Sequence, residues 1–318
     1  MKIIIASPRG LAGGIIVLHM LCKLLSEQGH DVKIFYFGEV DKDTYQRKVI
    51  FWYRQCKWIV KDTLKLMFSK VVVNKEKLSP RYEKYWYTPV SGCKRKIFPF
   101  FNKKNTVVIY PEIVYGNFLR ATKVVRWLLY HNRYQGDKNA FGKDDLIVCY
   151  REIFNDKELN PDNKILHVNY FDLNLYKQTN FGERVGNCYI LRKGKNRSDL
   201  PNSFDGIIVD DLTEQQKVKV FNQCKYCYSY DMQTAYSDIA ALCGCISIKV
   251  PESGCSATDY MKGNDSRYGI AYGDSADEIE YAIKTRQLLV DRFYDKSRDE
   301  SNKNEVESFI KILEKEFY

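Results

Sequence analysis

The sequence has no uninterrupted apolar stretch long enough to cross a membrane. A transmembrane helix needs about 20 mostly apolar residues, and no run in this chain approaches about 18 uncharged apolar residues. Residues 1–25 superficially resemble a signal peptide, but Pro8, Arg9 and the pair Gly13 and Gly14 interrupt any apolar core. We therefore expect a cytoplasmic protein that is neither secreted nor membrane-spanning.

The ten cysteines lack the regular spacing of a disulfide framework. Several lie inside apolar runs, as reduced buried thiols do, which indicates a reducing compartment. Cys224 and Cys227 raise the question of zinc, but Cys243 and Cys245 lack the two-residue spacing of a second zinc knuckle. We expect no metal and no cofactor.

The chain also lacks internal repeats and a low-complexity linker. Its 318 residues exceed a typical single core and suit two α/β domains of about 150 residues each. We place the boundary within residues 176–182. The predicted domains are residues 1–178 and residues 179–318.

The N-terminal domain opens as strand, loop, helix and strand. Lys2–Ala6 predicts a buried strand, residues 7–14 form a glycine-rich loop, and Ile15–Leu25 has the apolar spacing of a helix. Gly29 ends this helix, and residues 30–37 supply the second strand. A glycine-rich turn alone is a weak signal of a dinucleotide site.

Glu112 is the acidic candidate of this domain because it directly follows the β-rich run Thr106–Tyr110. Open α/β sheets bind ligands at the carboxyl ends of their strands, so Glu112 is placed to bind an acceptor or abstract a proton. Alternatively, it supports the start of a helix over residues 124–128. Strands at residues 145–150 and 165–170 complete the predicted domain.

Four cations follow the next predicted strand, Gly186–Leu191. They are Arg192, Lys193, Lys195 and Arg197. With Gly194 allowing close backbone approach, this cluster can clamp a diphosphate. A solvated loop is the alternative. A strand at residues 207–209 and a helix over Thr213–Cys224, with Thr213 as N-cap, come next.

Residues 227–251 predict a strand, a polar turn, a short helix and a second strand. The first turn of that helix leaves backbone N–H groups without intrahelical partners near Thr234, Ala235 and Tyr236, and a diphosphate fits such an end. Asp238 lies one helical turn after Thr234 and can accept hydrogen bonds from ribose hydroxyls. An ordinary βαβ crossover with a capped helix is the alternative.

This segment resembles the donor-binding segment of glycosyltransferases with the GT-B fold, and most of all bacterial relatives of glycosyltransferase family 4. In that family two Glu residues with seven residues between them bracket the segment. Asp238 corresponds to the second Glu, which binds the ribose. The first position holds Tyr230, and the nearest acid, Asp231, is one residue out of register. The resemblance implies a donor site and leaves a retaining or inverting outcome open.

Other segments share the resemblance. The pair Gly13 and Gly14 resembles the GT-B opening, in which the first helix approaches the donor phosphates. Arg192 with Lys193 or Lys195 corresponds to an Arg and a Lys that bind the pyrophosphate, and residues 110–129 resemble bacterial polysaccharide glycosyltransferases. The implied fold is α/β GT-B, two Rossmann-like domains with parallel sheets facing across a cleft, with the last helix able to pack back on the first domain.

The activity implied by the resemblance is transfer of a sugar from a nucleotide-sugar donor to a glycan or lipid-linked acceptor in bacterial surface polysaccharide synthesis, such as O-antigen, capsule or exopolysaccharide. Glu112 and Arg192 are the expected catalytic residues. The expected donor-binding residues are Gly13, Gly14, Arg192, Lys193, Lys195, Tyr230, Asp231, Thr234, Ala235 and Asp238. No Asp-x-Asp motif of a metal-dependent sugar-nucleotide site lies in the predicted donor segment, so we expect cations rather than a metal to neutralise the diphosphate. A sugar-nucleotide epimerase of the same fold is the alternative enzyme.

The net charge of +10 is concentrated in residues 47–104, where sixteen Lys and Arg face three acidic residues, a local balance of +13. Aromatic residues alternate with these cations, as in surfaces that bind anionic lipid. A nucleic-acid groove has the same composition, and a solvated basic face is a third reading. We expect peripheral binding to an anionic membrane rather than to nucleic acid, since a nucleic-acid-binding protein leaves Arg192 and the donor segment unexplained.

Overall fold

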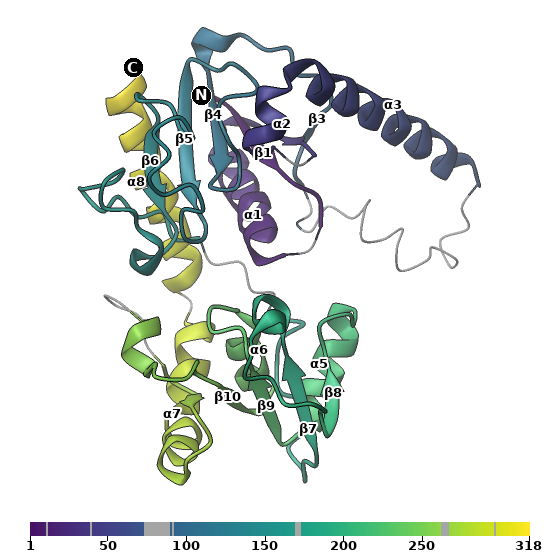
Figure 1. Cartoon of the computed structure of the whole chain (residues 1–318), viewed down its shortest axis with the longest axis vertical. Helices are drawn as coiled ribbons and strands as arrows, with labels where there is room; N and C mark the ends of the chain where they lie inside the picture. Colours follow the sequence, from purple (N-terminus) through teal and green to yellow (C-terminus); the bar gives the residue numbers. More distant parts are fainter. Residues whose placement is uncertain are drawn as a thin grey trace. The chain divides into compact units, whose positions relative to one another are not determined.

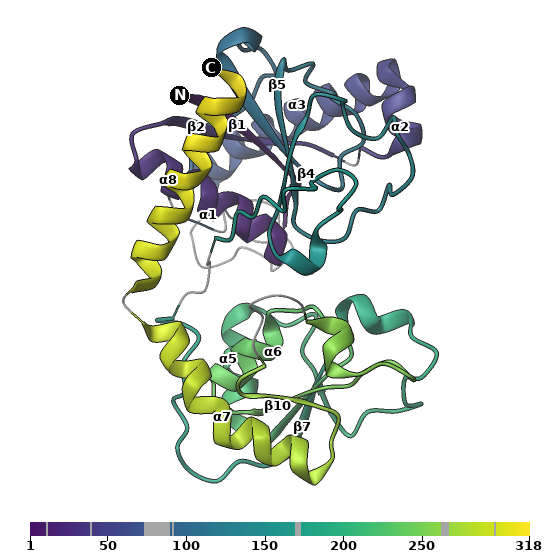
Figure 2. The ribbon, with the colours of Figure 1, turned by 90° about the vertical axis from the view of Figure 1, so that its left-hand side faces the viewer.

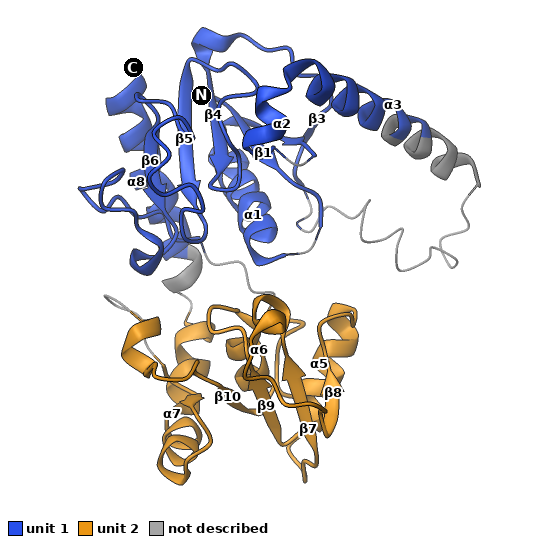
Figure 3. Cartoon of the chain, viewed as in Figure 1, with its two compact units in different colours: residues 1–170, 299–318 blue, residues 171–298 orange. Residues whose placement is uncertain are grey.

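The computed structural model describes residues 1–10, 12–38, 40–72, 90, 92–168, 173–261, 267–295 and 297–318. The chain forms two compact units, shown in Figure 3: unit 1 comprises residues 1–170 and 299–318, and unit 2 comprises residues 171–298. The predicted boundary after residue 178 therefore lies inside unit 2. Residues 299–318 belong to unit 1, the domain on which the last helix was expected to be able to pack.

Unit 1 is built on a six-stranded parallel sheet in the order β3-β2-β1-β4-β5-β6 (Figure 1). The strands are β1 (Lys2–Ser7), β2 (Asp31–Tyr36), β3 (Arg95–Lys96), β4 (Thr106–Pro111), β5 (Lys123–Leu128) and β6 (Leu146–Cys149). The helices are α1 (Gly13–Glu27), α2 (Lys42–Gln46), α3 (Lys48–Val72) and α8 (Ser297–Phe317), with 3₁₀ turns η2 (Lys103–Asn105) and η3 (Glu152–Phe154). This is the doubly wound order, in which the direction of winding reverses between β1 and β4.

Both faces of this sheet are covered, so its strands read as nearly continuous apolar runs. On one face Ile3 and Ile5 pack with apolar residues of α1 and α8, among them Leu18 and Phe309. Figure 2 shows α8 running beside α1 on unit 1. On the other face Ile4 packs with aromatic residues of α3 and of the segment after β4. The core of unit 1 thus lies on both sides of β1 and β4.

The helix predicted over residues 124–128 is wrong, because this segment is strand β5. Val125 and Trp127 face one core cluster, while Val124 faces the other. Alternation of buried faces is the period of a strand, and β-branched and aromatic side chains suit it. An apolar run buried on both faces looks the same as a short buried helix in the sequence.

The other expected strands of unit 1 have mixed outcomes. Residues 2–6, 30–37, 106–110 and 145–150 coincide closely with β1, β2, β4 and β6. The expected strand at 165–170 is reduced to an isolated bridge between Ile165 and Cys149, and residues 169 and 170 lie outside the described part of the chain.

Unit 2 is built on a five-stranded parallel sheet in the order β11-β10-β9-β7-β8. The strands are β7 (Asn187–Ile190), β8 (Gly206–Ile208), β9 (Tyr226–Ser229), β10 (Ile246–Lys249) and β11 (Ile270–Tyr272). The helices are α5 (Glu214–Gln223), α6 (Tyr236–Leu242) and α7 (Ala276–Tyr294), with 3₁₀ turns η4 (Arg192–Asn196) and η5 (Ala257–Tyr260). The expected α/β class, with a Rossmann-like parallel sheet in each half, is confirmed.

The core of unit 2 lies between its sheet and helices α5 and α6, and it is rich in cysteine. Cys188 of β7 and Cys227 of β9 are register partners and pack with Phe221 and Ile239. Seven of the ten cysteines are buried, and all ten are free thiols. The expectation of reduced, buried thiols agrees with this core. The N-cap expected at Thr213 is confirmed, since its hydroxyl accepts a hydrogen bond from the Gln216 amide.

Candidate functional site

The winding of unit 2 reverses between β7 and β9, because β7 pairs with β8 on one side and with β9 on the other. In open α/β sheets ligands bind outside the carboxyl ends of the strands at such a switch point. Arg192 follows β7, and Tyr230 and Asp231 follow β9. The structure therefore brings these three predicted site residues to one edge.

Arg192 is held there in an unusual backbone conformation. Its φ angle is +40°, a left-handed value that residues with side chains rarely adopt. The Asp210 carboxylate accepts hydrogen bonds from the backbone N–H groups of Leu191 (3.1 Å) and Arg192 (2.6 Å). Sequence reasoning assigned no role to Asp210. Its only signal was an acidic residue just after the strand that pairs with β7.

The guanidinium of Arg192 stays accessible. Its Nε lies 3.9 Å from Oδ2 of Asp231, and its Cζ lies 5.0 Å from the ring centroid of Tyr236. The Arg192 side chain is 27% exposed, whereas that of Asp231 is 5% exposed. A cation fixed by these neighbours and open to solvent can receive an anion.

Arg197, from the same cationic segment, has a different role. Its guanidinium donates to the backbone carbonyls of Tyr230 (3.3 Å), Val250 (2.7 Å) and Pro251 (3.0 Å). It also pairs with Asp199 at 2.5 Å. Arg197 thus ties the carboxyl ends of β9 and β10 together, and its hydrogen-bonding capacity is used within the protein.

Lys193 and Lys195 are exposed on η4 beside Arg192. Gly194 between them is buried, and a Cβ atom added there would overlap the backbone carbonyl of Tyr230. Only glycine lets η4 lie this close to the end of β9. The close approach expected at Gly194 is therefore made to the protein's own backbone.

The segment predicted to bind the donor, residues 227–251, has the expected order of β9, turn, α6 and β10. In the turn, Asp231 Oδ1 accepts a hydrogen bond from the Gln233 amide at 3.1 Å, and the Thr234 hydroxyl accepts one from the Tyr236 amide at 3.3 Å. Ala235 is the N-cap of α6 and offers no side-chain cap, while Asp238 lies half-buried in the first turn. These residues all lie near the end of β9. The expectation that the N–H groups of Thr234 and Tyr236 are open to a diphosphate is wrong, because they donate to the Asp231 carbonyl and to the Thr234 hydroxyl.

A buried polar cluster behind Arg192 was missed by sequence reasoning. Glu214 Oε1 accepts hydrogen bonds from the Tyr236 hydroxyl (2.7 Å) and the Lys217 ammonium (2.9 Å). Glu214 Oε2 accepts one from the Tyr176 hydroxyl (2.7 Å). We call these four residues the Glu214 cluster. Glu and Lys three apart on α5 look like an ordinary surface pair in the sequence, and only the fold shows that both are largely buried.

Unit 1 has its switch point between β1 and β4, where Glu112 directly follows β4. Glu112 is buried, and its Oε2 accepts a hydrogen bond from the backbone N–H of Leu129, the first residue after β5, at 3.0 Å. Glu112 does not support a helix at residues 124–128, since that helix is absent. The carboxylate instead satisfies the backbone at the end of β5.

The start of α1 lies at the same edge as Glu112. A Cβ added to Gly14 would lie 3.4 Å from Cδ1 of Leu129, whose N–H binds Glu112. The N-cap of α1, Ala12, provides no side-chain cap, and the N–H groups of Gly13 and Gly14 donate to no group in the described chain. Uncapped helix starts of this kind attract anions.

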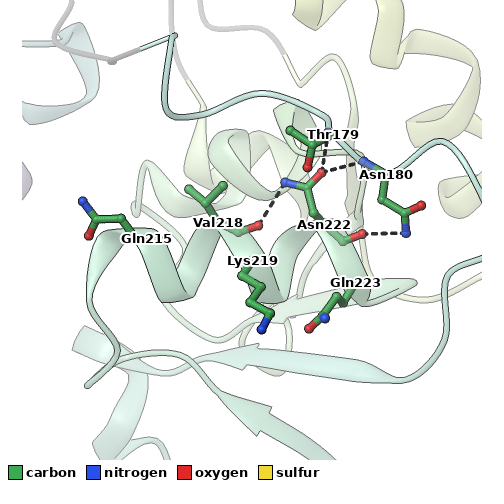
Figure 4. Close-up of a pocket in the computed structure, with 7 residues that line it drawn as sticks. All are labelled: Thr179, Asn180, Gln215, Val218, Lys219, Asn222 and Gln223. Atoms are coloured by element: carbon green, nitrogen blue, oxygen red, sulfur yellow. Dashed lines mark hydrogen bonds between the residues drawn. The ribbon is translucent and has the colours of Figure 1, made fainter.

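A pocket of about 510 Å³ lies along α5 (Figure 4). Its lining is Thr179, Asn180, Gln215, Val218, Lys219, Asn222 and Gln223. The Asn222 side chain accepts hydrogen bonds from the Thr179 and Asn180 amides (2.7 and 3.2 Å) and donates to the Val218 carbonyl. Since α5 returns from the end of β8 to the start of β9, Asn222 lies at the amino edge of the sheet, away from Arg192.

No three or more His, Cys, Asp or Glu side chains in the described ranges are arranged to hold a metal ion. This includes the cysteines considered for zinc, Cys224, Cys227, Cys243 and Cys245. Metal independence of the reaction stays a prediction.

The exposed face of α3 carries an apolar stripe. Val49 is 84% exposed and Tyr53 66%, and Val60 and Leu64 continue the stripe at helical spacing. Exposed Arg54, Lys57 and Lys61 border it. The opposite face buries Phe51, Gln55 and Ile59. Residues 73–89 and 91 of the predicted basic surface lie outside the described residues. Among the helices that the structure describes, none combines the length and the apolar character needed to span a membrane.

No protein-family model matches the chain, and no curated protein matches it. Among solved structures, the chain is similar to the spinosyn rhamnosyltransferase SpnG complexed with thymidine diphosphate, at 10% identity over 100% of this chain and 96% of that chain, with a TM-score of 0.32. It is also similar to MurG of Acinetobacter baumannii, at 9% identity over 99% of this chain and 100% of that chain, with a TM-score of 0.25.

Proposed function

We propose that this protein is a glycosyltransferase whose unit 2 binds the diphosphate of a nucleotide-sugar donor. The observation that supports this most directly is Arg192 at the β7–β9 switch point, with its left-handed backbone held by Asp210. Strained residues persist where the surrounding structure over-determines them, and they cluster at ligand sites. A fixed, accessible guanidinium there can stabilise the charge that develops on a departing diphosphate.

In this proposal Lys193 or Lys195 adds positive charge beside Arg192, since both lie exposed on η4. Asp238, in the first turn of α6, accepts hydrogen bonds from the ribose. Tyr230 and Asp231 are assigned to the sugar and the backbone N–H of Ala235 to the phosphates, since the Thr234 N–H already donates to the Asp231 carbonyl at 3.4 Å. In unit 1, Gly13 and Gly14 are proposed to bind a phosphate oxygen through their backbone N–H groups at the start of α1.

Glu112 is the proposed general base that takes the proton of the acceptor hydroxyl. Its hydrogen bond from Leu129 fixes one carboxylate oxygen at the switch point of unit 1. A positioned carboxylate of this kind contributes about a hundredfold or more to rate. We propose a glycan or lipid-linked acceptor in bacterial surface polysaccharide synthesis.

The experiment is calorimetric titration of the full chain with UDP, GDP, ADP and dTDP, with and without excess EDTA. We expect at least one diphosphate to bind, with and without EDTA. Arg192→Ala should weaken that binding at least about tenfold, or 1.4 kcal/mol. Lys219→Ala, an exposed cation on α5, is the matched control and should bind as the wild type does. Absence of binding by the wild type, or equal affinity in Arg192→Ala, contradicts the proposal. Conversion of a sugar nucleotide without an acceptor would indicate an epimerase.

We also propose that α3 binds an anionic membrane surface, which would present a lipid-linked acceptor. Its exposed apolar stripe can enter the headgroup boundary, and each nearby cation contributes about 1 kcal/mol at such a surface. Lys57 and Lys61 border the stripe. This peripheral contact would lie on the inner face of the plasma membrane.

Co-sedimentation with vesicles of phosphatidylglycerol and phosphatidylcholine tests this contact. The double variant Lys57→Glu/Lys61→Glu should lose most binding, whereas Lys303→Glu/Lys311→Glu, with the same charge change on the exposed face of α8, should retain it. Competition by a single-stranded oligonucleotide for the same residues would favour nucleic acid instead. Failure to co-sediment at low salt would exclude the membrane contact.

A further inference from the structure

The Glu214 cluster is a buried polar network that the proposed reaction leaves without a role. It links α5 and α6, and its Tyr236 ring lies 5.0 Å from the Arg192 guanidinium. We propose that Glu214 is the positioning residue for Arg192: it holds Tyr236 so that the ring supports the guanidinium in the orientation that receives a diphosphate. This inference rests on the proposed function of unit 2.

The contacts of the cluster leave Tyr236 little freedom. Its hydroxyl lies 2.7 Å from Glu214 Oε1 and 3.3 Å from the Lys217 ammonium. Lys217 also lies 4.6 Å from the ring centroid, so two cations, Lys217 and Arg192, contact one ring. An aromatic face attracts cations, which makes the ring a support for the guanidinium.

The burial of the Lys217–Glu214 ion pair indicates a role for the cluster besides stabilising the fold. The Lys217 side chain is 6% exposed and that of Glu214 18%. Desolvating two charges offsets much of their attraction, and replacing such a pair by apolar residues is often neutral or stabilising. The cluster's contact with the partly exposed Arg192 gives the pair a use at the site.

The protonation states of Tyr236 and Glu214 determine which of the two donates in the hydrogen bond between them. Burial, followed by the adjacent Glu214 carboxylate, raises the pKa of the Tyr236 phenol above its usual value, so the phenol stays protonated. Burial alone would raise the pKa of Glu214, but the hydrogen bond from Tyr236 and the Lys217 ammonium hold it below its usual value. The phenol therefore donates to an ionised carboxylate, a strong and directional hydrogen bond.

Arg192 has a second fixed neighbour, the Asp231 carboxylate, at 3.9 Å. That distance is longer than a hydrogen bond, so Asp231 alone does not set the orientation of the guanidinium. The hydrogen bonds from the backbone to Asp210 fix the position of the Arg192 backbone, and the ring of Tyr236 restricts the position of its guanidinium. Loss of Glu214 should therefore change the orientation of Arg192 rather than its location.

A double-mutant cycle tests the inference, with the affinity for the tightest-binding diphosphate among UDP, GDP, ADP and dTDP as the readout. Glu214→Gln should weaken binding about threefold to tenfold, as expected for residues coupled through a contact. In the Arg192→Ala background the same change should have no further effect. Gln215→Ala, the exposed neighbour on α5, is the control and should match the wild type.

If the double variant loses diphosphate affinity by the sum of the two single losses, the inference is overturned. A general structural role of Glu214 would weaken binding independently of Arg192. Wild-type affinity in Glu214→Gln would overturn it as well. Tyr236→Phe removes only the hydroxyl and repeats the cycle if Glu214→Gln fails to fold. If Arg192→Ala itself binds the diphosphate as the wild type does, the proposed function of Arg192 fails, and this inference fails with it.

Discussion

Unit 1 reverses its winding between β1 and β4, and unit 2 between β7 and β9. At the first edge the structure places a buried carboxylate, Glu112, and the uncapped start of α1. At the second it places an accessible arginine, Arg192, between the carboxylates of Asp210 and Asp231. The order of the strands thus determines where a site can form, and the residues that follow the strands determine its chemistry.

The same contrast separates the buried arginine of unit 1 from the accessible one of unit 2. Arg126 is fully buried, pairs with Asp145 at 2.6 Å and donates to the carbonyls of Val114 and Gly116. Arg192 keeps a partly exposed guanidinium. Arg126 therefore has the contacts of a structural residue, whereas Arg192 has the accessibility that the proposed binding role requires.

The largest expected effect is on stability in Arg126→Met. This change leaves the 8% exposed Asp145 carboxylate without its partner, and we expect the free energy of unfolding to fall by about 3–5 kcal/mol. Arg192→Ala should change it by less than about 1 kcal/mol, since its side chain is partly exposed. Urea denaturation of both variants measures this difference, and similar losses would remove the distinction between the two arginines.

The next largest expected effect is on turnover, in a variant of Glu112 at the switch point of unit 1. In Glu112→Gln the amide oxygen can still accept the Leu129 N–H, but the side chain can no longer take a proton. We expect turnover to fall about a hundredfold while diphosphate affinity is unchanged. Steady-state rates and calorimetry measure the two quantities. Glu152→Gln, an exposed acid after β6, is the control, and unchanged turnover in Glu112→Gln would exclude the base.

A smaller effect compares two glycines. A Cβ at Gly194 overlaps the Tyr230 carbonyl, so Gly194→Ala forces the backbone apart and should cost about 1–3 kcal/mol. A Cβ at Gly14 makes an ordinary contact at 3.4 Å from Leu129, so Gly14→Ala should be neutral or stabilising by up to about 1 kcal/mol. Thermal unfolding compares the two variants. A larger loss in Gly14→Ala would contradict the close packing at Gly194.

The smallest expected effect is a pH dependence of opposite sign in the two units. Hydrogen bonding lowers the pKa of Glu214 against the effect of burial, so its contribution is present above its ordinary value of about 4.5 and is lost as pH falls through the folded pKa. In unit 1, burial raises the pKa of Glu305. The ionised Glu305 carboxylate therefore destabilises the folded state at neutral pH, and this cost decreases as the carboxylate becomes protonated at lower pH.

Urea denaturation between pH 3 and pH 7 checks both signs. The stability gap between wild type and Glu214→Gln should shrink on the order of 1 kcal/mol as the solution is acidified below about pH 4.5. The free energy of unfolding of Glu305→Gln should exceed that of the wild type by the largest amount near neutral pH. A gap for Glu214→Gln that is independent of pH would contradict the assigned ionised state.

Much of the fold could be predicted because its signals are local. Apolar runs predicted β1 and β4, the apolar spacing after Gly14 predicted α1, and Thr213 predicted the start of α5. The positions of Arg192 and Asp231 also followed from chain order, since each comes directly after a predicted strand. Strand β5 was missed, because burial on both faces hides the two-residue period.

What the sequence determined by itself was the order of strands and helices and the residues that follow each strand, because periodicity and stop signals act over a few neighbouring residues. Only the tertiary structure decided what those residues touch. Arg192 and Arg197 are five positions apart and chemically identical, yet one stays accessible and the other binds the carbonyls after β9 and β10. The Glu214 cluster likewise exists only because α5 and α6 pack on the same face of the sheet. Burial and hydrogen bonding depend on partners distant in the chain, which no local pattern can specify.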